Sequence, residues 1–236
     1  MKVAGERISP RYVFVVDKIG KHLIDDIGGY EIGELDQVVQ FQNGSFENIQ
    51  TYFDMQSRQY TDAKAVVCLW VGMEDLAEEV PENAQIPPEH FHPLGPRIIP
   101  RLDVADTISA YHDLLDSLAI SLPSSVVVST APAPRRSAGF ANRRAEKVGK
   151  GISKRFPLHH HIGVRQGFVC QLKGKDAARL PGGRCPINPD RFLDDGMTPD
   201  IESFQIVIRR CYAALSVFLE LPPVFPESLV TTVMWF

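Results

Sequence analysis

The chain alternates between short apolar runs and longer segments in which apolar residues recur every three or four positions. The clearest run is 65–71, AVVCLWV, and the polar turn 72–75, GMED, follows it directly. A short, β-branched apolar run of this kind is typical of a strand buried on both faces, in the centre of a parallel sheet. Ligands of α/β proteins bind just beyond the carboxyl ends of such strands, so this turn is a candidate position for chemistry.

Four further stretches predict strands of the same sheet, at 12–16 (YVFVV), 35–41, 125–130 (SVVVST) and within 156–164. Apolar residues at helical spacing predict helices after the strands, with faces that run over 19–27, 46–53, 104–118, 141–152 and 204–218. Strands and helices that alternate at these lengths imply right-handed crossovers. We therefore predict a three-layer α/β/α fold with a five-stranded, mostly parallel sheet.

Two long segments interrupt this alternation. Residues 78–101 contain six prolines, which exclude a regular helix or an inner strand. We expect an ordered loop there, over the carboxyl edge of the sheet, that serves as a lid or as a partner surface. Residues 172–200 form a second loop rich in glycine and proline. Neither resembles a flexible linker, so we predict one domain over 1–221.

The remaining segment, 222–236, is a largely apolar tail that ends in Met234, Trp235 and Phe236. Large apolar side chains at a chain end are costly to leave in water. We expect the tail to pack on its own domain, on a second copy of the chain, or on a different protein.

Composition places the chain among ordinary globular proteins, with 236 residues, 44% hydrophobic and 23% charged. No apolar run approaches the ~20 residues that span a bilayer, and the first residues contain no hydrophobic signal core. We therefore expect a cytoplasmic or nuclear protein without membrane contact. The four cysteines have no C-x-x-C spacing, so we expect reduced thiols.

The strand ends resemble the sequence blocks of the SGNH (GDSL-like) hydrolases, in the family's order. Residues 16–18, VDK, stand where the family has G-D-S, and Gly44 follows the second strand as the family's lone glycine does. The turn 72–75, GMED, resembles G-x-N-D, and 194–198, DDGMT, resembles D-x-x-H. The resemblance implies the family's α/β/α fold, with site positions at Asp17, Lys18, Gly44, Gly72, Glu74, Asp195 and Thr198.

The resemblance also implies that the catalytic roles are replaced. Lys18 stands at the serine nucleophile, Thr198 at the histidine base and Glu74 at the asparagine that helps to bind the oxyanion. A lysine ammonium does not replace a serine hydroxyl unless its pKa is strongly lowered, and a carboxylate repels a developing oxyanion. We therefore expect no enzymatic activity, with Lys18, Glu74 and Asp195 in an ion-pair network. The RNA-binding domain of Oskar is similar in logic, because its active residues are also replaced.

The strongest positive signal is the basic segment 135–155. It has one acid, Glu146, against eight cations, Arg135, Arg136, Arg143, Arg144, Lys147, Lys150, Lys154 and Arg155. At about 100° per residue, a row of four cations (143, 147, 150 and 154) lies opposite an apolar stripe. Such a row suits a phosphate backbone; an acidic protein partner and an ordinary solvated face are the alternatives.

The run His159, His160 and His161 raises the question of a metal site. Alternate residues of a strand face opposite sides, so at most two of these histidines share a face. No further ligands stand nearby in the sequence, so we expect no metal and no cofactor.

These patterns favour an SGNH-like domain that binds RNA or acts as a scaffold through its basic helix. One alternative is an active esterase whose nucleophile or base comes from elsewhere, for example from His90, His92 or the histidine run near a serine. Another is a protein-interaction scaffold that uses the proline-rich segment and the tail.

Overall fold

The computed structural model describes residues 11–17, 36–81, 83, 85–88, 98–136, 139–154, 160–165, 168, 187–194 and 198–220. The helix expected over 19–27, the predicted tail 222–236 and residues 82, 84 and 89–97 of the proline-rich segment lie outside the described residues. So do Lys18, His159, Arg155 and Asp195. The division into one domain and a tail therefore stays a prediction.

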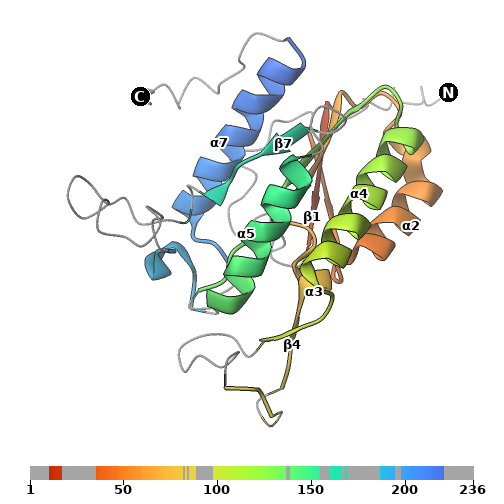
Figure 1. Cartoon of the computed structure of the whole chain (residues 1–236). Helices are drawn as coiled ribbons and strands as arrows, with labels where there is room; N and C mark the ends of the chain where they lie inside the picture. The colour runs from red at the N-terminus through yellow and green to blue at the C-terminus, as the bar shows by residue number, and fades with distance from the viewer. Residues whose placement is uncertain are drawn as a thin grey trace, which may run out of the picture.

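A five-stranded sheet forms the centre of the molecule (Figure 1). Its strands run in the order β2-β1-β3-β6-β7 and are all parallel, with bounds β1 Tyr12–Val16, β2 Gln37–Gln40, β3 Ala65–Leu69, β6 Val126–Thr130 and β7 His160–Ile162. β1 and β3 are buried along their whole length, as continuous apolar runs require. The predicted fold class is confirmed.

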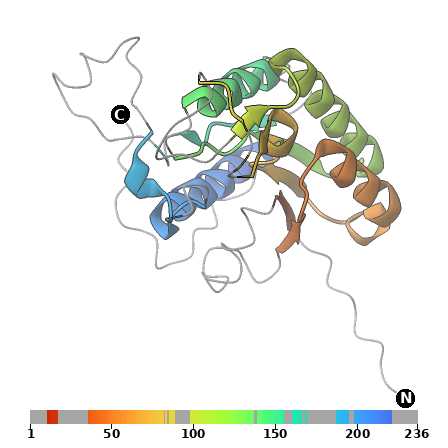
Figure 2. The ribbon, with the colours of Figure 1, turned by 90° about the horizontal axis from the view of Figure 1, so that it is seen from below.

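Helices cover both faces of this sheet (Figure 2). One face packs against α2 (Phe46–Gln56), α4 (Val104–Ser121) and α5 (Gly139–Ser153), which lie side by side. The other face packs against α7 (Ile201–Phe218). Asp103 caps α4 and Asp200 caps α7, each accepting a hydrogen bond from a backbone amide of the first turn. No helix in the described residues has the length and apolar character needed to cross a membrane.

The proline-rich segment differs from the expected loop at its two ends. β4 (Ala77–Glu79) and β5 (Ile98–Pro100) pair there as a short antiparallel ribbon, which projects away from the sheet (Figure 1). Prolines are excluded from inner strands but are compatible with such an exposed two-stranded pair, and Pro100 is itself part of β5.

The central strand is also shorter than its apolar run. β3 ends at Leu69, because Trp70 adopts a left-handed backbone with φ 64°. Gly72 then begins the one-turn helix α3 (Met73–Leu76). Two further short elements among the described residues are the 3₁₀ turns η1 (Ser57–Gln59) and η4 (Pro189–Arg191).

Candidate functional sites at the sheet edge and on helix α5

The first family position on the sheet edge is Asp17, which directly follows β1 and is 1% exposed. Gly44, between β2 and α2, lies against it. A Cβ on residue 44 would come 2.5 Å from the Asp17 Cβ, closer than any real contact, so only glycine fits this turn. Steric contact with Asp17 therefore explains the glycine at position 44, while a functional role for Gly44 as a family site position stays a prediction.

The turn after β3 is joined to the start of α2 through Phe46. Gly72 has φ 96°, and a Cβ there would lie 2.6 Å from the Phe46 ring. One turn later, the Asp75 carboxylate accepts a hydrogen bond of 3.1 Å from the Phe46 backbone amide. Because α2 begins at Phe46, this bond satisfies one of its unpaired N-terminal amides. Gly72 and Asp75, which match the family pattern, therefore act as scaffold.

Asp75 is a carboxyl at this edge whose pKa is shifted by its surroundings. Burial raises the pKa of its carboxyl to about 6, and the Phe46 amide and the Arg101 charge only partly oppose that rise. The same turn is anchored on its other side, since the Leu102 amide donates to the Asp75 carbonyl at 3.0 Å.

The positions with changed chemistry are only partly described. Glu74 is half-buried, and its backbone carbonyl accepts a hydrogen bond of 3.3 Å from the Arg101 guanidinium. Thr198 is 3% exposed in the loop before α7, where its carbonyl accepts from the Leu193 amide at 2.8 Å. Lys18 and Asp195 lie outside the described residues, so the ion-pair network with Glu74 stays a prediction.

The strained residue at this edge, Trp70, was not singled out from the sequence. Its left-handed φ is rare for a bulky side chain. Its amide donates to the Thr130 hydroxyl at 2.9 Å, and its ring packs against Phe168 and Phe204. The only sequence signal was a tryptophan two residues before a glycine at the end of a strand.

Helix α5 has the two faces that its sequence predicts. Its apolar stripe is buried and its cationic row is exposed, the stripe comprising Ala141, Ala145, Val148 and Ile152 and the row Arg143, Lys147, Lys150 and Lys154. We call these four cations the cationic row.

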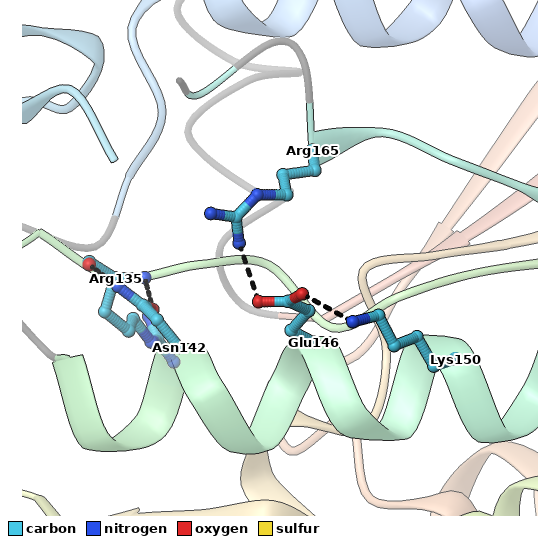
Figure 3. A network of polar contacts seen from close by, with 5 residues as sticks. All are labelled: Arg135, Asn142, Glu146, Lys150 and Arg165. Carbon is cyan, nitrogen blue, oxygen red and sulfur yellow. Dashed lines mark hydrogen bonds and ion pairs between the residues drawn. The ribbon is translucent and has the colours of Figure 1, made fainter. Parts of the chain in front are cut away.

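One member of the cationic row is paired. Glu146 lies 2.9 Å from the Lys150 ammonium and 3.2 Å from the guanidinium of Arg165, which follows β7 (Figure 3). The helix's single acid is thus held between two cations. Within the described part of the chain, Arg143, Lys147 and Lys154 form no ion pair. Arg165 was missed because it lies outside the basic segment.

Other predicted members of the basic set do not face the solvent in this way. Arg135 is 3% exposed, because the Asn142 side chain exchanges two hydrogen bonds of 2.6 Å with its backbone and draws it against α5 (Figure 3). Arg144 donates to the Leu102 carbonyl and lies 5.4 Å from the Phe140 ring centre. Arg136 is half-buried. Arg135 is therefore removed from the predicted RNA-contacting set, and Arg144 is engaged in packing.

The described histidines of the run point to opposite sides of β7, as strand geometry requires. His160 stacks on Phe218 of α7 with ring centres 4.1 Å apart, whereas His161 lies 3.0 Å from the Ser129 hydroxyl. Burial lowers the pKa of His161 to about 4, so the ring is neutral at pH 7. Ser129 is fully buried and cannot reach a substrate, so this pair is no nucleophile and base. Among the described residues, no three His, Cys, Asp or Glu side chains gather as metal ligands.

Comparison with known proteins gives the fold but no sequence family. No family profile and no curated protein matches the sequence. Solved structures do match, among them a protein described as a GDSL-like lipase from Parabacteroides merdae, with 12% identity, a TM-score of 0.54 and coverage of 89% of this chain and 96% of the other.

A carbohydrate esterase of family 3 from Talaromyces cellulolyticus has 11% identity and a TM-score of 0.54, covering 89% of this chain and 98% of its own. An acetyl-xylooligosaccharide esterase from Geobacillus Stearmophilus has 10% identity and a TM-score of 0.54, covering 86% and 93%. The chain therefore has an SGNH-hydrolase-like α/β fold, as the resemblance of its strand-end residues implied.

The same comparisons correct one prediction. The expectation that the chain is not an enzyme is wrong, because matching solved structures are described as esterases and a lipase. The three changed positions do not by themselves establish a loss of activity. Of the three positions behind that expectation, Lys18 lies outside the described residues.

Proposed function

We propose that this SGNH-like domain binds RNA through the outer face of α5. The observation that carries the proposal is the cationic row, whose four side chains are exposed along one side of a helix that docks by its opposite side. Nearly all affinity for a phosphate backbone comes from such charges and the counterions they release. None of the four is needed to hold the helix in place, since Ala141, Ala145, Val148 and Ile152 do that.

The arrangement of acids distinguishes this face from an ordinary solvated one. Exposed helix faces commonly interleave acids and bases as i,i+4 pairs. Here the only acid is Glu146, which two cations already engage, and Arg165 adds a cation from the neighbouring strand end. The local excess of positive charge contrasts with the net charge of −4 of the whole chain.

Titration of labelled single-stranded RNA at several salt concentrations tests the proposal. Four phosphate contacts predict a slope of log K against log salt of about −3, because single strands contribute about −0.7 for each contact. The affinity should depend little on sequence, since phosphate contacts position a ligand without reading its bases. A protein that binds no RNA at low salt would refute the proposal, whereas binding only to an acidic polypeptide would favour a protein partner.

A second candidate function is ester hydrolysis, and the shared fold with carbohydrate and acetyl esterases favours it. It is compatible with RNA binding, because the cationic row lies on the exposed face of α5, whereas Asp17, Gly44 and Gly72 lie at the ends of β1, β2 and β3. The candidate predicts saturable hydrolysis of 4-nitrophenyl acetate that a serine- or lysine-directed reagent abolishes. Turnover at the buffer rate would eliminate it.

A further inference from the structure

A pocket of about 180 Å³ lies between α5, the chain after β6 and the end of β7. Much of its wall is apolar and made of small or rigid residues, namely Ala131, Pro132, Pro134, Ala145, Gly149 and Val164. Its polar lining includes His161 and the three-residue network of Glu146, Lys150 and Arg165 that Figure 3 shows. Lys150 therefore belongs both to the pocket and to the cationic row.

The hydrogen bonds of His161 determine what it offers to this pocket. The Ser129 hydroxyl donates to the His160 carbonyl at 3.3 Å, and the same oxygen lies 3.0 Å from Nδ1 of His161. With its proton directed to that carbonyl, the hydroxyl accepts from Nδ1, which fixes the tautomer. Nε2 of the neutral ring is then a hydrogen-bond acceptor on the pocket side, where an added Cβ on Gly149 would lie 4.0 Å from it.

The shape and chemistry of the pocket limit its occupant. It is smaller than the roughly 300–1,000 Å³ pockets of drug-sized ligands, so it admits a single small ring system. The alanine, proline and glycine walls suit a flat apolar face. The acceptor of His161, with the cations of Lys150 and Arg165 in the same lining, suits a ring that carries both an N–H donor and carbonyl oxygens. Uracil has this combination.

We propose that this pocket receives one unstacked uracil of the RNA bound along α5. The proposal rests on the proposed function, because Lys150 belongs to the cationic row and also lines the pocket. Proteins that read single-stranded RNA splay bases out and hydrogen-bond their edges in this way. The uracil N3–H donates to Nε2 of His161, and its flanking carbonyl oxygens accept from the cations of the lining.

The test compares three oligomers of the same length and charge: oligouridine, an abasic oligomer, and oligo-N3-methyluridine, which lacks the donor. Wild-type protein should bind oligouridine about tenfold more tightly than the abasic oligomer, since burying one base and forming one hydrogen bond each contribute. It should bind the N3-methyl oligomer more weakly than oligouridine, because a methyl group replaces the proton that donates to Nε2 of His161, and this comparison requires no variant.

The matched variants are His161→Phe and His160→Phe, neighbours on β7 whose rings face opposite sides. His161→Phe should lose about three- to tenfold of the preference for oligouridine and keep its affinity for the abasic oligomer. His160→Phe should keep both. If wild type binds oligouridine and the abasic oligomer equally, the uracil pocket is refuted, whereas RNA binding through the cationic row is not. A preference for oligouridine that is unchanged in His161→Phe would have the same consequence. Failure to bind either oligomer would overturn both proposals.

Discussion

The carboxyl edge of the sheet and the outer face of α5 carry the two sets of unusual residues in this molecule, and they are built in opposite ways. At the edge, Gly44, Gly72 and Asp75 are in close contact with buried neighbours. On α5, the cationic row projects from a helix that packs without it. Changes at the edge should therefore alter stability, whereas changes in the cationic row should alter only what the molecule binds.

The largest expected effect is on the turn after β3. Gly72→Ala places a Cβ at φ 96° and 2.6 Å from the Phe46 ring, so we expect a loss of about 3 kcal/mol in the free energy of unfolding. Chemical denaturation measures it. Gly163→Ala is the matched control, because a Cβ there meets nothing within 4 Å, and it should change stability by less than about 0.5 kcal/mol. Similar values for both variants would contradict the packing at this edge.

The second prediction concerns pH and Asp75. Because its pKa in the folded protein, about 6, lies above the ordinary value of 3.8, the folded state binds the proton more tightly than the unfolded chain. This carboxyl therefore contributes stability at low pH that is lost as the pH rises through about 4 to 6.

Asp75→Asn keeps an oxygen acceptor for the Phe46 amide and removes the titration. As the pH rises across that interval, the melting temperature of wild type should fall relative to that of Asp75→Asn. A difference in melting temperature that stays constant from pH 4 to pH 7 would show that the carboxyl is not buried as described.

A smaller effect separates two adjacent arginines of α5. The Arg144 guanidinium donates to the Leu102 carbonyl and lies over the Phe140 ring, so Arg144→Ala should lower the free energy of unfolding by about 1–2 kcal/mol. Arg143 is exposed and has no ion pair in the described region, so Arg143→Ala should stay within about 0.5 kcal/mol. Equal losses would mean that the two faces of the helix are not distinct.

Much of the fold was predictable because the spacing of apolar residues along the chain matches the positions that are buried in the structure. The run YVFVV gave β1 with the bounds observed, and the stripe from Ala141 to Ile152 gave the buried face of α5. The sequence did not reveal that β3 stops at Leu69, since Trp70 is apolar and its left-handed backbone is imposed by the turn into Gly72.

The site was less predictable, because it depends on contacts between residues far apart in the chain. Arg135 belongs to the basic segment by sequence, yet Asn142 draws it into the interior. Arg165 lies outside that segment, yet it joins Glu146 across the gap between β7 and α5. Charge patterning along a helix locates a cationic face, and only tertiary contacts decide which cations are paired.

The most direct test of the central claim is RNA binding by two double charge reversals of equal size. Lys147→Glu with Lys154→Glu alters two members of the cationic row that form no ion pair within the described residues. Arg58→Glu with Lys64→Glu makes the same charge change at exposed cations elsewhere. The first should weaken binding and reduce the salt slope by about 1.4, because two phosphate contacts are lost. The second should leave the slope at about −3. Equal slopes for both double variants would contradict binding through α5.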